Sequence, residues 1–199
     1  MAHYFSSDQS QIKSSPKPIR FTIAGQAYDL TTEAGVFSKQ GLDFGSRLLL
    51  ESLEMPEGSS VLDLGCGYGP IGIVCARRFL AKVWMADINE RAVKTAEANA
   101  KANHIAATVV VSDGFSAIEG TFDYIVTNPP IRAGKTTIYG WFERARQFMN
   151  PGGSLVLVIR KDQGAASAET ELKRLYESVA IIGKKSGYFV FRCRLGLTN

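Results

Sequence analysis

The sequence predicts an α/β fold in which a mostly parallel, seven-stranded sheet carries helices on both faces. Short apolar segments alternate with longer segments of helical periodicity from residue 60 onwards. The apolar segments contain few polar residues, which is typical of parallel strands buried on both faces. Residues 180–194 then hold two strand-like segments joined by Lys-Lys-Ser-Gly, which predicts a C-terminal antiparallel hairpin.

Length and composition indicate one globular domain. The chain has 199 residues, of which 45% are hydrophobic and 21% are charged, and this excludes wholesale disorder. The net charge of +4 and the pI of about 9.0 are compatible with a polyanionic partner. The three cysteines and two histidines lack the spacing of metal ligands, so we expect no metal site and a reducing, cytoplasmic location. No apolar run is long enough for a membrane span, and the N-terminus lacks the apolar core of a signal peptide.

The chain divides into a polar arm and a domain. We expect residues 1–19 to form a flexible N-terminal arm and residues 20–199 to form a single domain. Within the domain, residues 20–58 hold a hairpin at 20–30 and a helix at 43–53, and residues 59–199 form the core.

The core elements follow from the alternating pattern. The predicted strands lie at residues 60–64, 82–88, 107–113, 122–128 and 154–160. The predicted helices lie at residues 70–79, 89–103, 137–149 and 167–179. Asn89 is suited to cap the second of these helices, and Glu90 and Lys94 are spaced for an i,i+4 pair within it.

A glycine-rich loop, DLGCGYGPIG, connects the first core strand to the first core helix. Gly67, Gly69 and Gly72 satisfy the G-x-G-x-x-G pattern, and Asp87 lies twenty positions after Gly67, as in dinucleotide-binding proteins. An additional Gly65 follows Asp63, which favours S-adenosylmethionine (SAM) over a nicotinamide cofactor. A ligand with an amino-acid tail and a sulfonium benefits from nearby carboxylates.

Acidic residues end three consecutive strands. Asp63 and Asp87 end the first two, and the Asp87 carboxylate could accept hydrogen bonds from both ribose hydroxyls of a cofactor. Asp113 ends the third, where it could bind the adenine amino group while Phe115 packs against the ring. Since ligands of open α/β sheets bind at the carboxyl ends of the strands, these residues predict a cofactor site.

The motifs DLGCGYG, ADINERAV, SDGF and NPP, in this order, resemble those of class I SAM-dependent methyltransferases. The stretches TTEAGVFSKQGLDFGSRLLLE, TNPPIRAGK, RKDQGAASA and GYFVFRCR are similar to those of the small, single-domain RsmC-like family, over about residues 30–194. Characterised members of that family methylate the N2 amine of guanine in small-subunit ribosomal RNA.

The resemblance implies a Rossmann-like class I methyltransferase fold and assigns residues to two sites. The implied SAM-binding residues are Phe37, Ser38, Asp63, Gly65, Cys66, Gly67, Gly69, Asp87, Ile88, Asp113, Gly114, Phe115 and Asn128. The residues implied to face the target base are Asn128, Pro129, Pro130 and Ile131. The implied partner is RNA, as ribosomal RNA or a small-subunit particle, and we expect a monomer or weak homodimer.

The Asn-Pro-Pro sequence suits the chemistry of an exocyclic amine, whose lone pair is delocalised into the ring. The Asn128 side-chain oxygen and the Pro129 carbonyl could accept both N–H bonds and localise that lone pair, and the prolines fix the backbone. Cys66 is better interpreted as a small filler than as a nucleophile. Ile131 replaces the aromatic residue common in adenine and glutamine methyltransferases, so aromatic stacking on the base must come from elsewhere.

Three alternatives remain open. The acceptor could be another planar amine, adenine N6 or a protein glutamine. The chain could be a catalytically silent RNA-binding module, although such a module has no need of Asp87, Asp113 and the NPP motif together. A nicotinamide oxidoreductase is supported only by the literal glycine pattern. Basic residues follow the NPP motif and recur near the C-terminus, and sequence does not decide whether they share a face: Arg132, Lys135, Lys161, Lys184, Lys185, Arg192 and Arg194.

Overall fold

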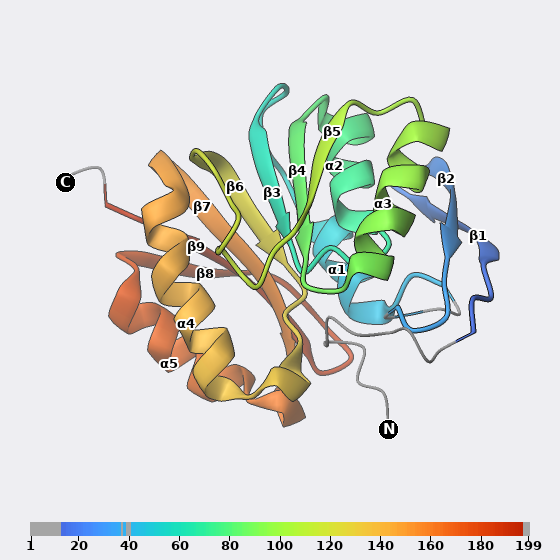
Figure 1. Ribbon diagram of the computed structural model, residues 1–199. Helices are drawn as coiled ribbons and strands as arrows, with labels where there is room; N and C mark the ends of the chain where they lie inside the picture. Colours follow the sequence, from blue (N-terminus) through green and yellow to red (C-terminus); the bar gives the residue numbers. More distant parts are fainter. Residues whose placement is uncertain (1–12, 37, 39–40, 197–199) are drawn as a thin grey trace.

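The computed structural model describes residues 13–36, 38 and 41–196, and a seven-stranded sheet forms its centre (Figure 1). The strand order is β5-β4-β3-β6-β7-β9-β8, and the pairs are parallel except those that β9 forms with β7 and β8. The strands are β3 (Ser60–Leu64), β4 (Lys82–Asp87), β5 (Ala107–Val111), β6 (Phe122–Thr127), β7 (Met149–Arg160), β8 (Ser178–Lys185) and β9 (Tyr188–Arg194). The predicted sheet, with its C-terminal antiparallel hairpin, is confirmed.

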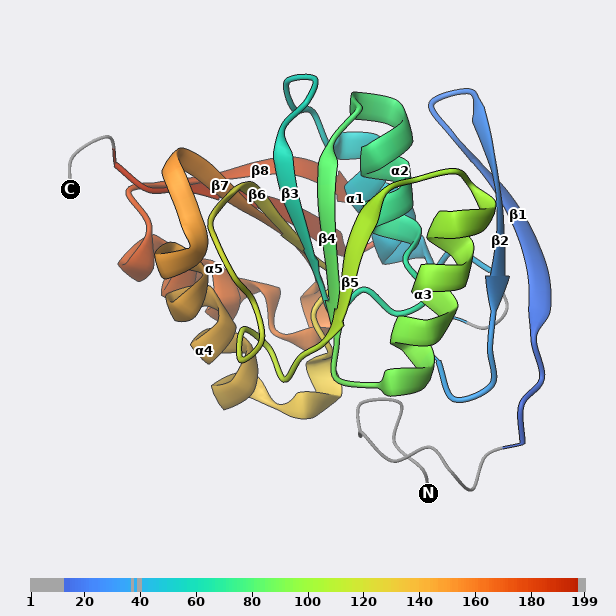
Figure 2. The ribbon, with the colours of Figure 1, turned by 45° about the horizontal axis from the view of Figure 1, so that its top comes forward.

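Helices cover both faces of the sheet, as predicted (Figures 1 and 2). One face carries α1 (Phe44–Ser52), α2 (Pro70–Phe79) and α3 (Glu90–Ala102), whose apolar residues share one buried cluster. The other face carries α4 (Lys135–Ala145) and α5 (Ala165–Leu175), whose apolar residues form a second cluster. The two clusters are the two halves of the core, one on each side of the sheet.

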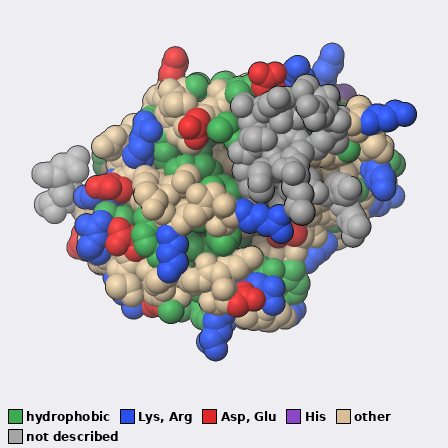
Figure 3. All heavy atoms as spheres, turned by 60° about the horizontal axis from the view of Figure 1, so that its bottom comes forward, with side chains coloured by type: hydrophobic (Ala, Val, Ile, Leu, Met, Phe, Trp, Pro, Cys, Tyr) green, Lys and Arg blue, Asp and Glu red, His purple; other side chains and the backbone are tan. Residues whose placement is uncertain are grey.

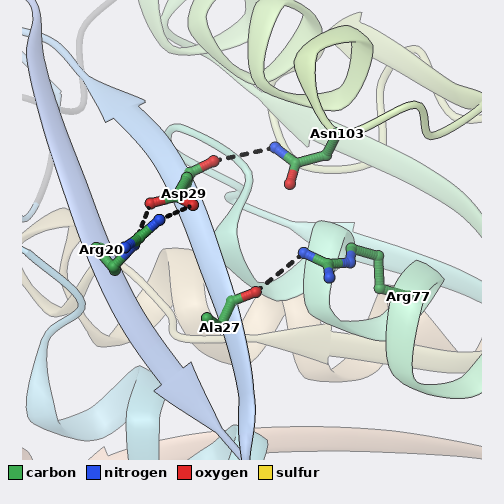
Figure 4. Close-up of polar contacts among 5 residues, drawn as sticks. All are labelled: Arg20, Ala27, Asp29, Arg77 and Asn103. Atoms are coloured by element: carbon green, nitrogen blue, oxygen red, sulfur yellow. Dashed lines mark hydrogen bonds and ion pairs between the residues drawn. The ribbon is translucent and has the colours of Figure 1, made fainter.

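A separate hairpin, β1 (Lys17–Ile23) and β2 (Gln26–Thr32), packs beside α2 and α3. The Asn103 amide nitrogen donates to the backbone oxygen of Asp29 at 3.1 Å, and Arg77 donates to that of Ala27 at 3.1 Å (Figure 4). Strand β1 begins at Lys17, inside the segment expected to be an arm, because residues 17–19 pair with β2. Residues 1–12 lie outside the described residues.

Two predicted helices have different ends in the structure. The helix predicted over 167–179 ends at Leu175. The reason is tertiary: the Tyr176 hydroxyl donates a hydrogen bond to the Phe142 carbonyl oxygen at 2.7 Å, and Val179 pairs with Cys193 in the sheet. The helix predicted over 137–149 begins at Lys135 and ends at Ala145, and three short 3₁₀ turns occur at Ile131–Ala133 (η1), Arg146–Phe148 (η2) and Lys161–Gln163 (η3). Strand β7 begins at Met149, earlier than predicted, with an irregular stretch before Ser154.

The carboxyl ends of β3, β4, β5 and β6 lie at one edge of the sheet, and the loops that follow them gather there (Figure 2). None of the helices in the described part of the chain is both long and apolar enough to cross a membrane. Within the same residues, no group of three or more His, Cys, Asp or Glu side chains could hold a metal ion.

Candidate functional site

A cavity of about 350 Å³ opens at this edge of the sheet. Four strand-end loops contribute to its wall, and most of the predicted site residues line it. They are Ser38, Gly65, Cys66, Gly67, Asp87, Ile88, Asp113, Gly114, Asn128, Pro129, Pro130 and Ile131. The structure therefore brings the predicted cofactor-binding and base-facing residues into one continuous cavity.

Three predicted residues lie behind the cavity wall. Asp63 is completely buried, and its Oδ2 accepts a hydrogen bond from the Gly72 backbone at 2.8 Å, so it anchors the start of α2. Gly69 packs against α3, because a Cβ there would lie 3.2 Å from that of Ala96. Phe115 stacks on Phe148 in the core with ring centroids 4.8 Å apart, so its ring anchors the loop after β5 to the core. The predicted residue Phe37 lies outside the described residues.

Asp87 organises the glycine loop from the end of β4. Its Oδ2 accepts a hydrogen bond from the Gly67 backbone at 2.8 Å, and its Oδ1 accepts one from the Asn89 backbone at 2.9 Å. Burial raises the pKa of the Asp87 carboxyl, although these N–H groups oppose the increase. A carboxylate offers about four acceptor positions, so a position remains for a ribose hydroxyl beside these backbone N–H groups. The acceptor capacity of Asp87 fits the hydroxyl groups of the SAM ribose.

Asp113 is suited to a different part of the same ligand. Its side chain is exposed at the cavity and has no hydrogen-bond partner within the described part of the chain. Its own backbone N–H donates to Ser116 Oγ at 3.1 Å, which holds the turn after β5. An available carboxylate at this position can accept hydrogen bonds from the amino group of adenine.

Trp141, from α4, closes this side of the cavity and was not predicted. A Cβ at Gly114 would lie 2.7 Å from the Trp141 indole nitrogen, and one at Gly65 would lie 3.5 Å from the ring. Both glycines have positive φ, which favours glycine, and at Gly114 the turn also passes the indole too closely for a Cβ. The indole thereby joins α4 to the ends of β3 and β5.

Asn128 is held in one orientation by residues that sequence reasoning missed. Its amide nitrogen donates to Ser46 Oγ at 3.0 Å and to Asp43 Oδ1 at 3.2 Å. The same Asp43 oxygen caps α1 by accepting from the Ser46 backbone at 3.1 Å. Among the described residues, no donor reaches the Asn128 side-chain oxygen, so this oxygen remains an acceptor at the cavity. Asp43 and Ser46 belong to the stretch that carried the family resemblance, and that was the available signal.

The cavity also contains an aromatic side chain from a distant strand. Tyr188 of β9 lines the wall, and its ring lies 5.2 Å from that of Phe44 between centroids. Ile131, in contrast, lines the cavity with an aliphatic side chain that packs partly buried against the core. An aromatic surface is therefore present although Ile131 does not supply it.

The cysteine of the glycine-rich loop is poorly suited to act as a nucleophile. Cys66 is buried, and burial raises the pKa of its thiol well above the ordinary value. A thiol that stays protonated is a poor nucleophile. This agrees with the interpretation of Cys66 as a small filler.

Comparisons with known proteins place this geometry in context. The family described as Methyltransferase small domain matches residues 27–192. The uncharacterized protein YbxB of Bacillus subtilis (strain 168) is 40% identical over 199 residues, covering 98% of this chain and 99% of that protein. Ribosomal RNA small subunit methyltransferase C of Pseudoalteromonas atlantica is 30% identical over 177 residues, covering 86% of this chain and 51% of that protein.

A solved structure shows the same architecture. The T. thermophilus 16S rRNA N2 methyltransferase RsmC, in complex with AdoMet and guanosine, matches with a TM-score of 0.83 and 28% identity. The match covers 91% of this chain and 51% of that chain. The chain thus spans about half the length of these two ribosomal RNA methyltransferases.

Proposed function

Because the chain belongs to the methyltransferase small domain family and has the Rossmann-like fold of class I SAM-dependent methyltransferases, we propose a specific reaction for it. The proposed reaction is methylation of the N2 amine of guanine in small-subunit ribosomal RNA. The relatives named above as ribosomal RNA methyltransferases support this choice of substrate. The proposed partner is RNA, either free or within a small-subunit particle.

The orientation of Asn128 carries the proposal. An exocyclic amine on a purine has two N–H bonds, and its lone pair is delocalised into the ring. The Asn128 oxygen is directed to the cavity because Ser46 and Asp43 hold the amide nitrogen. The Pro129 carbonyl accepts no hydrogen bond from any described residue, so it is the second available acceptor. Two fixed acceptors can take both N–H bonds and localise the lone pair on nitrogen.

The remaining contribution of the protein is positioning. When bound, SAM supplies a methyl group on a sulfonium, and S-adenosylhomocysteine (SAH) leaves as the nitrogen lone pair forms the new bond. Asp87 and Asp113 hold the ribose and adenine, and Asn128 and Pro129 hold the amine in line. Such alignment turns an encounter into a near-unimolecular step and can contribute several kcal/mol. Asn128 is neutral, so the proton that the amine loses after transfer passes to water.

The decisive experiment follows methyl transfer to unmodified small-subunit ribosomal RNA and to small-subunit particles from a deletion strain. Mass spectrometry of the nucleosides should show N2-methylguanosine at one position. Asn128→Ala should abolish the product while SAH affinity changes by less than about threefold, because its contacts are to the amine. Asn103→Ala is the matched control, because it removes a side-chain amide that contacts the β1–β2 hairpin at Asp29 and does not line the cavity. It should retain activity.

Each alternative predicts a different result. N6-methyladenosine or a methylated protein glutamine would replace the guanine assignment. A wild-type protein that binds RNA but transfers nothing to either substrate would support a silent binding module. Calorimetry that detects NAD but not SAH would support an oxidoreductase.

A further inference from the structure

Three segments that are distant in sequence meet at the mouth of the cavity. Arg132 of η1, Gln163 of η3 and Tyr188 of β9 all line it. The Lys161 backbone donates to the Gly187 carbonyl at 2.7 Å, which ties η3 to the β8–β9 turn. A Cβ added at Gly164 would lie 3.7 Å from Lys135 Cε, so the start of α4 lies against the end of η3. Residues 131–137, 160–164 and 183–188 therefore form one continuous border.

This border is strongly basic. We call the following six exposed residues the basic rim: Arg132, Lys135, Arg160, Lys161, Lys184 and Lys185. The only acidic residue in the three segments is Asp162, and it pairs with Arg160 at 3.2 Å. The other five cations form no ion pair with any residue that the structure describes.

Some basic residues elsewhere in the described part of the chain have acidic partners. Arg20 pairs with Asp29 on the hairpin, and Arg78 pairs with Glu54 beside α2. Five of the six rim cations form no such pair with a described residue, and keeping like charges together costs free energy in the folded protein. Charges maintained in this way around a cavity are suited to a polyanion outside the protein.

We propose that the basic rim binds RNA phosphates on either side of the target nucleotide. This inference rests on the proposed function, because it takes the cavity as the pocket of an RNA base. A base that enters a pocket leaves its ribose and flanking phosphates at the entrance, where the rim lies. Figure 3 turns the lower edge of the molecule forward and shows Lys and Arg side chains, with Asp and Glu side chains among them, around apolar surface.

Aromatic rings hold two of the rim cations. The Arg160 guanidinium carbon lies 5.8 Å from the centroid of the Tyr188 ring, and the Lys184 ammonium lies 5.0 Å from that of Phe189. Cations alternating with aromatic rings are typical of surfaces that bind single-stranded nucleic acid, since rings stack on bases while cations contact phosphates. Tyr188 lines the cavity and also contacts the rim residue Arg160, so the rim adjoins the pocket.

The test neutralises three rim lysines that do not line the cavity: Lys135→Gln, Lys161→Gln and Lys185→Gln in one protein. The control protein carries Lys82→Gln, Lys94→Gln and Lys101→Gln, three exposed lysines of β4 and α3. The probe is small-subunit ribosomal RNA transcribed in vitro, with binding measured by anisotropy over a salt series. The rim variant should bind at least about tenfold more weakly at 0.1 M salt, and its slope of log K against log salt should fall by about 2. The control should match wild type, and both variants should bind SAH as wild type does.

The outcomes separate the rim from the proposed chemistry. Equal RNA affinity and equal salt slope for the rim variant and wild type would overturn the rim, even if N2-methylguanosine is formed. Loss of RNA binding in the rim variant alone would support the rim, even if wild type methylates another base or none. Normal binding to free RNA with lost binding to a small-subunit particle would assign the rim to a ribosomal protein and overturn it as a phosphate site.

Discussion

Asp43 and Asn128 are 85 positions apart in the chain, and a hydrogen bond of 3.2 Å joins the carboxylate of one to the side-chain amide of the other. Asp43 is also the N-cap of α1, a helix that packs on the sheet. The contact therefore links the orientation of a residue in the strand-end loop to the position of a helix. We infer that Asp43 is a positioning residue for the proposed reaction.

Substitutions at Asp43 should separate capping from positioning. Asp43→Ser keeps a good N-cap but is too short to hold the Asn128 amide, so kcat should fall by about tenfold with little loss of stability. Asp43→Asn retains an oxygen for both hydrogen bonds and should restore most of the activity. Single-turnover methyl transfer, SAH affinity and thermal unfolding are the measurements. Wild-type kcat in Asp43→Ser would show that Ser46 alone suffices.

Asp87 should dominate cofactor affinity. In Asp87→Asn the amide nitrogen would face a backbone N–H, of either Gly67 or Asn89, and one ribose acceptor would be lost. Losing a charge-assisted hydrogen bond of about 1.5–3 kcal/mol should weaken SAH binding by about 10- to 100-fold. Calorimetry with SAH measures this directly.

Asp113→Asn is the comparison for Asp87. Its amide oxygen can still accept from the adenine amino group, so SAH binding should weaken by less than in Asp87→Asn. RNA affinity should be unchanged in both variants. An equal loss of SAH affinity at the two positions would contradict the assignment of the ribose to Asp87.

The elements of the core could be predicted where local sequence decides them. Strand β3 and helix α2 have the predicted bounds because a continuous apolar run, a glycine turn and Pro70 at the first helical turn define them. The end of α5 could not be predicted, because Tyr176 leaves the helix for a hydrogen bond to Phe142, which is 34 positions away. The local periodicity of apolar residues does not indicate such a tertiary contact.

The site was predictable in the same partial way. Residues at strand ends, such as Asp87 and Asp113, reach the cavity because the topology of a parallel sheet places them there. Asp63 comes earlier in its strand, and its side chain faces α2. Trp141 and Tyr188 come from elements far along the chain, and only the packing of those elements brings them to the cavity.

Gly114 should be intolerant of a side chain because of Trp141. Gly114→Ala adds a Cβ at 2.7 Å from a rigid indole and also places alanine at φ of +56°. Gly120→Ala is the matched control, since its φ is +80° and a Cβ there would meet nothing within 4 Å. We expect Gly120→Ala to cost about 1 kcal/mol of unfolding free energy and Gly114→Ala about 2–4 kcal/mol.

A double mutant isolates the contact with the indole. Trp141→Leu removes the ring, so Gly114→Ala should cost less in that background, by at least about 1 kcal/mol. Urea unfolding of the four proteins in the cycle measures the coupling. Additive costs would show that the strain at Gly114 comes from its backbone alone.

Asp63 should make stability depend on pH. The pKa of its carboxyl is raised to about 7, mainly by burial and also by the nearby Asp87 carboxylate, while the Gly72 N–H opposes the increase. Above about pH 4 the unfolded chain releases this proton, but the folded protein retains it until about pH 7. The folded state therefore binds more protons in this range, so its stability falls as pH rises and then levels off.

Asp63→Asn should remove this dependence. The asparagine oxygen can still accept from the Gly72 N–H, whereas its amide nitrogen replaces an oxygen that has no hydrogen-bond partner among the described residues. The variant can be less stable than wild type at pH 5, because that buried nitrogen has no acceptor. Relative to wild type, however, the variant should gain stability between pH 5 and pH 8, by at most about 3 kcal/mol, because about two pH units separate pH 5 from the folded-state pKa of Asp63. Urea unfolding of the SAM-free proteins at both pH values measures the change, and a constant difference would show that Asp63 is already ionised at pH 5.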